Sequence, residues 1–167
     1  MITNFKIVSK NGFQRVVGQK LEGVTQMDLF KPEYQPDHYS WKYKNELFKR
    51  RCDPIETQTL IVSPTSLNLI VKQNPEKYGP DNLLILDPDG IESHRLINPY
   101  RFYSEYQEGD EFEFLSPQTA GDKLMVKISV CRTLPGKSYK QEPTYGTFYD
   151  CDTWDYTPLE FIDSRNL

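Results

Sequence analysis

The residues best placed for catalysis form one short cluster, which reads Asp87-Pro-Asp89-Gly-Ile-Glu92-Ser-His94. A hydrolytic site would need one of the two aspartates to converge with Glu92 and His94 on a single pocket. Alternation along a strand after the turn would place Glu92 and His94 on the same face, which permits this arrangement. Turn chemistry explains the same spacing, because proline presets a turn and glycine takes the positive φ at its end. A hydrolase using this cluster is therefore an alternative function, and no catalytic residue is assigned.

A second group of carboxylates lies near the C-terminus, at Asp150, Asp152 and Asp155. Loops rich in carboxylates bind hard cations such as Ca²⁺, but the twelve-residue calcium loop with its glycine and terminal glutamate is absent. No metal or cofactor is predicted. No Lys or Arg lies between Asp150 and Asp163, a segment that also contains Glu160. The segment could instead form a negative face that engages a basic protein or imitates phosphates.

The segment from Trp41 to Arg51 interleaves aromatic residues with cations, in the order Trp-Lys-Tyr-Lys-Asn-Glu-Leu-Phe-Lys-Arg-Arg. Such a surface could neutralise phosphates while an exposed ring stacks on a base. This pattern supports nucleic-acid binding as a further alternative, through Lys42, Lys44, Lys49, Arg50 and Arg51. The sequence pI of about 5.3 argues against it as the leading function, because nucleic-acid-binding domains are usually basic overall.

The common enzyme motifs are missing from the sequence. It contains no Walker loop, GxGxxG, GxSxG or HExxH pattern. Cys52, Cys131 and Cys151 are odd in number and form no CxxC pair, which argues against a disulfide framework and a zinc ribbon. We therefore lean towards a protein that is not an enzyme and whose thiols are reduced.

The composition favours sheets and ordered loops. Only 37% of residues are hydrophobic, yet 13% are aromatic, and Ala120 is the only alanine. Alanine is the best helix former while aromatic residues suit strands, so the composition argues against an alanine-rich helical bundle. No run of eighteen apolar residues occurs and no basic segment precedes an apolar one at the N-terminus. The sequence predicts no membrane contact and a cytoplasmic location, or one within an intracellularly assembled particle.

The net charge of −4 is unevenly distributed. Residues 1–51 contain ten Lys and Arg against five Asp and Glu, whereas residues 52–167 contain ten against nineteen. Opposite fields on two surfaces could steer a charged partner, or let copies of the protein pair head to tail.

The chemistry-bearing residues must be positioned by turns, strands and two short helices. Asn11-Gly12 predicts a type I′ hairpin turn between strands at 3–10 and 13–19. Asp37 could cap a helix over 38–51, and a shorter helix is predicted over 65–72. The sequence predicts further strands, at 56–63, 82–87, 91–96, 111–115, 123–132, 144–151 and 159–162. Those at 111–115 and 123–132 should pair with each other.

These elements predict an α+β fold with a predominantly antiparallel sheet, with a partly open β-barrel as one arrangement. Residues 1–167 form one domain, in which residues 1–30 could be a semi-independent hairpin arm. The leading function is a non-catalytic protein-binding or assembly protein, such as a small viral structural subunit or an inhibitor of a larger complex. Its partner would be another protein or copies of itself. Tyrosine is favoured at interfaces, and the predicted contact residues are Trp41, Tyr43, Arg50, Arg51, Tyr103, Tyr106, Tyr149, Trp154 and Tyr156.

Overall fold

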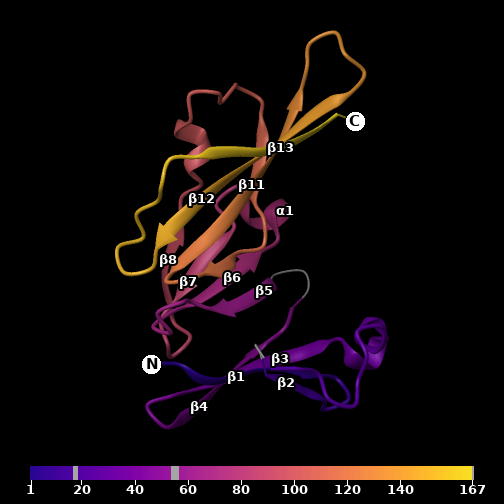
Figure 1. Ribbon diagram of the computed structural model, residues 1–167, viewed down its shortest axis with the longest axis vertical. Coiled ribbons are helices and arrows are strands. Elements are labelled where there is room, and N and C mark those ends of the chain that lie inside the picture. Colours follow the sequence, from indigo (N-terminus) through magenta and orange to yellow (C-terminus); the bar gives the residue numbers. More distant parts are fainter. Residues whose placement is uncertain (17–18, 54–56, 167) are drawn as a thin grey trace.

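The computed structural model describes residues 1–16, 19–53 and 57–166, which form three antiparallel sheets stacked in chain order (Figure 1). The N-terminal sheet has the strand order β2-β1-β3-β4. Its strands are β1 (Thr3–Ser9), β2 (Gln14–Val16), β3 (Pro36–Tyr43) and β4 (Glu46–Arg51). The short 3₁₀ helices η1 (Asp28–Phe30) and η2 (Pro32–Tyr34) lie between β2 and β3.

The middle sheet has the order β5-β6-β7-β8. It contains β5 (Thr57–Val62), β6 (Leu69–Gln73), β7 (Leu83–Leu86) and β8 (Glu92–Leu96), with the single-turn helix α1 (Pro75–Tyr78) after β6. The 3₁₀ helix η3 (Pro99–Phe102) follows β8.

The C-terminal sheet is built around the long hairpin of β11 and β12. Its strands are β9 (Glu111–Phe114), β10 (Gln118–Ala120), β11 (Lys123–Thr133), β12 (Lys140–Asp150) and β13 (Glu160–Asn166). The order is β10-β11-β12-β13, and β9 also pairs with β11. The predicted pairing of 111–115 with 123–132 is confirmed, since Phe114 lies opposite Ile128.

The middle sheet is buried on both faces. Ile70, Leu83 and Ile85 pack into a core with the C-terminal sheet. The alternating residues Leu69, Val71, Leu84 and Leu86 pack into a second core, shared with Phe5, Tyr39 and Trp41 of the N-terminal sheet. A strand with two buried faces is apolar without interruption, which explains the run from Leu83 to Leu86.

The predominantly antiparallel fold is confirmed, with few short helices and three sheets that do not close into a barrel. None of the described helices has the length and apolar character needed to cross a membrane. The predicted strands over 13–19 and 56–63 include residues 17, 18 and 56, which lie outside the described residues.

The helix predicted over 38–51 is wrong, because this segment is the β3–β4 hairpin. Lys44 and Asn45 both have positive φ angles, 49° and 66°, as a type I′ turn requires. Aromatic residues and cations alternate in the segment with a period of two, which places them on opposite faces of a strand. The helix predicted over 65–72 is also wrong. It contains a turn followed by β6, whose unbroken apolar run reflects burial on both faces.

The first hairpin is confirmed, but its turn differs from the prediction. The Gly12 N–H donates to the Ser9 carbonyl and the Ser9 N–H donates to the Phe13 carbonyl, each at 2.8 Å. Gly12 has a φ of 83°, whereas Asn11 is not among the positive-φ residues. The turn is therefore a three-residue loop with one left-handed glycine rather than a two-residue type I′ turn.

The turn between β7 and β8 joins the middle sheet to the N-terminal sheet. Trp41 Nε1 donates a hydrogen bond of 2.7 Å to the Pro88 carbonyl. Gly90 has a φ of 85°, and a Cβ there would lie 3.3 Å from the Trp41 ring. The Asp87 to Gly90 turn therefore has a structural role, because it seats the buried indole of β3.

The buried side chain of Asn82 connects the middle sheet to β9. Its Nδ2 donates to the Gln73 and Phe114 carbonyls at 3.2 Å, and its Oδ1 accepts from the Phe114 N–H at 2.9 Å. Replacement by alanine leaves these backbone groups without partners, so Asn82→Ala should lower the free energy of unfolding by about 2–3 kcal/mol. Urea denaturation measures the loss.

The matched control for this prediction is Asn74→Ala, which removes one exposed hydrogen bond at the start of α1. Loss of such a cap should lower the free energy of unfolding by about 1 kcal/mol. Equal losses in the two variants would contradict a connecting role for Asn82.

Candidate functional site

The predicted protein-contact residues do not share one surface. Trp41 and Tyr149 are buried, with 1% and 2% of their surfaces exposed. Tyr103 and Tyr106 lie beside Tyr100 in the segment that precedes β9. The remaining members lie on the β3–β4 hairpin or in the loop after β12: Tyr43, Arg50, Arg51, Trp154 and Tyr156.

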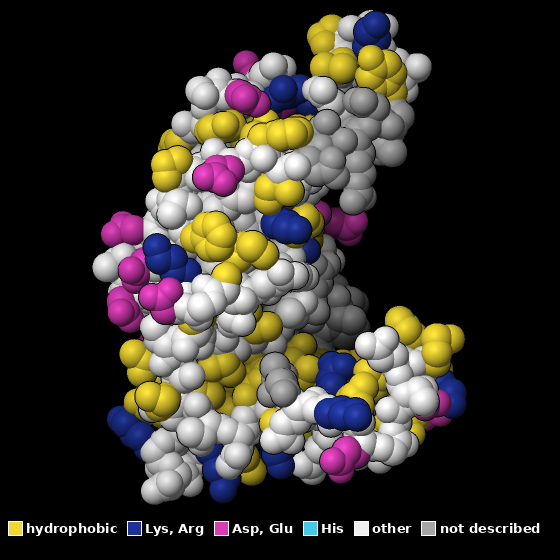
Figure 2. All heavy atoms as spheres, viewed as in Figure 1, with side chains coloured by type: hydrophobic (Ala, Val, Ile, Leu, Met, Phe, Trp, Pro, Cys, Tyr) yellow, Lys and Arg dark blue, Asp and Glu magenta, His cyan; other side chains and the backbone are white. Residues whose placement is uncertain are grey.

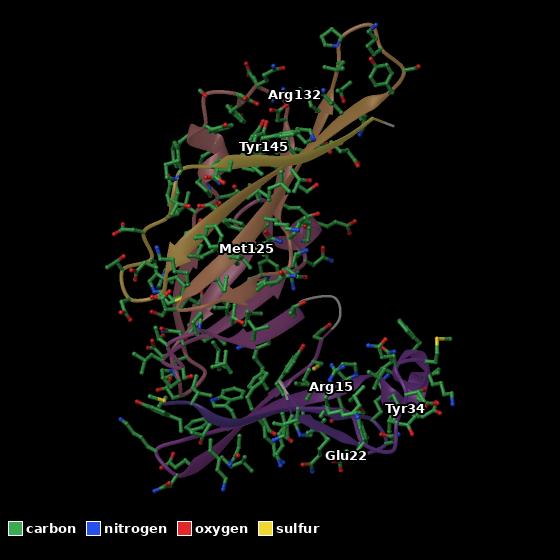
Figure 3. The ribbon with its side chains drawn as sticks, in the orientation of Figure 1. Arg15, Glu22, Tyr34, Met125, Arg132 and Tyr145 are labelled. Atoms are coloured by element: carbon green, nitrogen blue, oxygen red, sulfur yellow. The ribbon has the colours of Figure 1, made fainter. Side chains whose placement is uncertain are left out.

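The segment around η3 is held by a buried ion pair that the sequence did not reveal. Arg132 of β11 donates through Nε and Nη2 to the two carboxylate oxygens of Asp110, each at 2.9 Å (Figure 3). Nη2 also donates to the Tyr100 hydroxyl at 2.8 Å. The side chains of Arg132 and Asp110 are only 11% and 2% exposed. The guanidinium of Arg132 and the carboxylate of Asp110 are thus paired within the chain, so their role is structural.

Tyr145 of β12 extends the same network. Its hydroxyl donates to Glu105 Oε2 at 2.6 Å, and its ring packs against those of Tyr100 and Tyr103. Burial, followed by the hydrogen bond to the nearby carboxylate, raises the pKa of each buried tyrosine, Tyr100 beside Asp110 and Tyr145 beside Glu105. Both hydroxyls therefore stay protonated and serve as donors at neutral pH.

The carboxylate and histidine cluster is not brought together. A bulge in β8 pairs His94 with Ile85 and Glu92 with Leu86. Adjacent strand residues point to opposite faces, so the bulge places Glu92 and His94 on opposite faces of the sheet. The His94 ring instead packs edge-on against Trp154, with 5.5 Å between centroids. This geometry gives the hydrolase alternative no support.

Asp150, the last residue of β12, holds the turn that follows it. Asp150 Oδ1 accepts hydrogen bonds from the N–H groups of Asp152 and Thr153. These bonds lower the pKa of Asp150 below its ordinary value. Among the described residues, no group of His, Cys, Asp and Glu is arranged to bind a metal ion. The side chain of Asp163 lies outside the described part of the chain.

Four cations share the outer face of the N-terminal sheet. Register fixes its members: Lys6 lies opposite Ser40, which lies opposite Lys49. In the same way, Arg51 lies opposite His38. We call this surface the basic sheet face, and its cations are Lys6, Lys42, Lys49 and Arg51. Lys44 lies at the adjoining turn, and Arg50 belongs to the inner face with Tyr39.

The basic sheet face is hollowed. A groove of about 530 Å³ runs over it, and its described lining includes Lys6, His38, Lys42 and Lys49 but no carboxylate. Asp37, which precedes His38 in β3, places its Oδ2 2.8 Å from His38 Nδ1. The hydrogen bond to His38 lowers the pKa of Asp37. The described lining of the groove therefore carries three lysines and no carboxylate.

The aromatic residues on strands β1, β3 and β4 of the N-terminal sheet point away from the groove, towards the middle sheet. Phe5, Tyr39 and Trp41 belong to the core shared with the middle sheet, and Phe48 packs against it. Trp41 and Phe48 are stacked with 6.0 Å between centroids. The ring of His38 is therefore the only one among the described residues that line the groove.

Figure 2 shows the charge division on one side of the molecule. Lys and Arg side chains surround the N-terminal sheet at the bottom of the view, and Asp and Glu gather at the left over the upper body. No protein-family model, curated protein or solved structure matches the chain. The function of the basic sheet face is therefore inferred from its own charges and geometry.

Proposed function

We propose that the protein is a non-catalytic binding protein whose basic sheet face engages an acidic surface of another protein. The observation that carries this proposal is the gathering of Lys6, Lys42 and Lys49 in one groove of the sheet face, to which Arg51 also belongs by register. Like charges at neighbouring sheet positions repel each other. An anionic partner relieves this repulsion and gains the attraction of all four cations.

A protein partner is favoured over nucleic acid because of where the aromatic rings lie. Sheet surfaces that bind single strands stack bases on exposed aromatic side chains. Here Tyr39, Trp41 and Phe48 pack inwards, and the groove presents cations with Val8 and Leu47. Nucleic-acid binding remains the second candidate, because the same cations would attract phosphates.

The test is charge reversal at the centre of the face, in the variant Lys42→Glu/Lys49→Glu. Labelled poly-L-glutamate serves as the acidic probe and is titrated by fluorescence anisotropy. At about 0.01 M salt, where the Debye length is about 30 Å, the unmodified protein should bind the probe. The variant should bind about tenfold more weakly, equivalent to about 1.4 kcal/mol for two lost ion pairs.

The matched control is Lys137→Glu/Lys140→Glu, which changes the net charge equally. Both lysines are exposed and lie at the turn between β11 and β12, on the C-terminal sheet. The control should bind the probe as the unmodified protein does. Equal weakening in both variants would show a net-charge effect and overturn the proposal. Binding of oligo(dT) without binding of poly-L-glutamate would favour nucleic acid instead.

A further inference from the structure

The outer face of the C-terminal sheet exposes apolar side chains. Met125 of β11 lies opposite Phe148 of β12, on the face away from the core (Figure 3). Ile162 of β13 covers Gly146, where a Cβ would lie 2.6 Å from Ile162 Cδ1. Phe148 and Ile162 are 38% and 46% exposed. Neighbouring exposed apolar residues on a sheet are typical of an interaction surface.

Carboxylates surround these apolar side chains. Asp150 and Glu160 lie on the same outer face by register, and Asp152 and Asp155 are exposed in the loop that follows Asp150. By the same register, the cations of this surface are Lys123, Lys127 and, at the far end of β12, Lys140. We call this surface the apolar–acidic face, with the members Met125, Phe148, Ile162, Asp150, Asp152, Asp155 and Glu160. Within the described residues, none of its carboxylates forms an ion pair.

The basic sheet face and the apolar–acidic face cannot meet within one molecule. The first is the outer surface of the N-terminal sheet and the second that of the C-terminal sheet, with the middle sheet buried between them (Figure 1). The two faces are nevertheless complementary. One places Val8 and exposed Leu47 among cations, and the other places apolar side chains among anions.

We infer that the acidic partner of the basic sheet face is the apolar–acidic face of a second copy of this chain. This inference rests on the proposed function. Because the two contacting surfaces differ, each dimer keeps one free face of each kind. Association therefore continues head to tail, and its length increases with protein concentration. Attraction between exposed charges weakens as the Debye length shortens, so added salt should dissociate the assembly.

Sedimentation velocity of the full chain at increasing concentration tests this inference. Reducing agent is included because Cys131, which is half-buried, lies on the C-terminal sheet. At about 0.01 M salt the unmodified protein should form a concentration-dependent series of oligomers, which should dissociate at about 0.15 M salt. Lys42→Glu/Lys49→Glu reverses two charges of the basic sheet face. Asp152→Lys/Asp155→Lys reverses two charges of the apolar–acidic face. It leaves Asp150 unchanged, because the side chain of Asp150 stabilises its own turn.

Each variant alone should associate at least about tenfold more weakly than the unmodified protein. Each keeps one intact face, so an equimolar mixture should form dimers of one copy of each variant and nothing longer. Lys137→Glu/Lys140→Glu, at the opposite end of β12 from Asp150, should not weaken assembly. A two-fold symmetric dimer, or a mixture that stays monomeric, would overturn the inference.

Two further outcomes separate this inference from the proposed function. Unmodified protein that stays monomeric at low salt but binds poly-L-glutamate through Lys42 and Lys49 would overturn self-assembly alone. Protein that neither assembles nor binds the probe would overturn both.

Discussion

Replacing Arg132 by methionine should lower the free energy of unfolding by about 3–5 kcal/mol, which would be among the largest losses from any single substitution in this chain. The guanidinium is the bidentate partner of Asp110, whose side chain is 2% exposed. Its removal leaves a carboxylate buried without a counter-charge. It also removes the donor to the Tyr100 hydroxyl and the Glu105 carbonyl.

The control for Arg132 is the same change at a more exposed ion pair, Arg101→Met. Arg101 Nη2 lies 2.6 Å from Asp81 Oδ1, but these side chains are 34% and 26% exposed. Loss of this partly exposed pair should cost less, about 1 kcal/mol. Urea denaturation compares the two variants. The double variant Arg132→Met/Asp110→Leu should recover much of the loss, because it leaves no unpaired charge. Equal losses from Arg132→Met and Arg101→Met would contradict the buried-pair interpretation.

The pH dependence of the same variant gives a second measurement. Burial raises the pKa of Asp110, but the hydrogen bonds from Arg132, the Gln107 N–H and Tyr100 outweigh burial and lower it overall. The stability that Asp110 contributes is therefore present above the unfolded pKa of about 3.9, and is lost as pH falls through the lower folded pKa. Arg132→Met removes the main contact that lowers the pKa of Asp110. Burial should then raise the folded pKa above the unfolded value. Stability of the variant should then fall as pH rises from about 4 to about 7.

The second large effect is expected at Trp41, where alanine should lower the free energy of unfolding by about 3–5 kcal/mol. The indole is 1% exposed, stacks on Phe48 and donates to the Pro88 carbonyl. It is the largest side chain in the core between the N-terminal and middle sheets. Its loss should therefore loosen the N-terminal sheet from the rest of the molecule.

Hydrogen exchange locates this loss. In Trp41→Ala, the amides of β1, β3 and β4 should lose more protection than those of β11 and β12. Trp41→Phe keeps most of the ring volume and loses the hydrogen bond to Pro88, so its effect should be smaller. Equal loss of protection in all three sheets would show one cooperative unit and contradict a separate anchoring role for Trp41.

The strands that the sequence predicted best are those with one buried face. From Leu124 to Val130 the buried side chains alternate with partly exposed ones, as the period-two pattern indicates. The pattern is ambiguous where both faces are buried, as in β6, because an unbroken apolar run does not distinguish a strand from a helix. It was misinterpreted in the β3–β4 hairpin, where Lys44-Asn45 lacks the glycine that usually marks a type I′ turn.

The candidate surface could be predicted only in part. Lys42, Lys49 and Arg51 were identified from their local clustering. Lys6 was missed, because its place on the basic sheet face depends on pairing with Ser40, far along the chain. Trp41 and Tyr149 were selected as contact residues because of their type, but long-range packing buries both. The pairing of Arg132 with Asp110 also joins distant positions, and no local spacing indicates it.

The order of the three sheets has a consequence for synthesis of the chain on the ribosome. Each sheet is built from one continuous stretch, and the middle sheet, apolar on both faces, is made second. The N-terminal sheet can cover one of its faces at once. The other face is covered only after β9 to β13 have been synthesised. At a translation rate of about 5–20 residues per second, it stays uncovered for roughly 4–14 s. We expect the nascent chain to be most prone to aggregation, and most in need of a chaperone, during this interval.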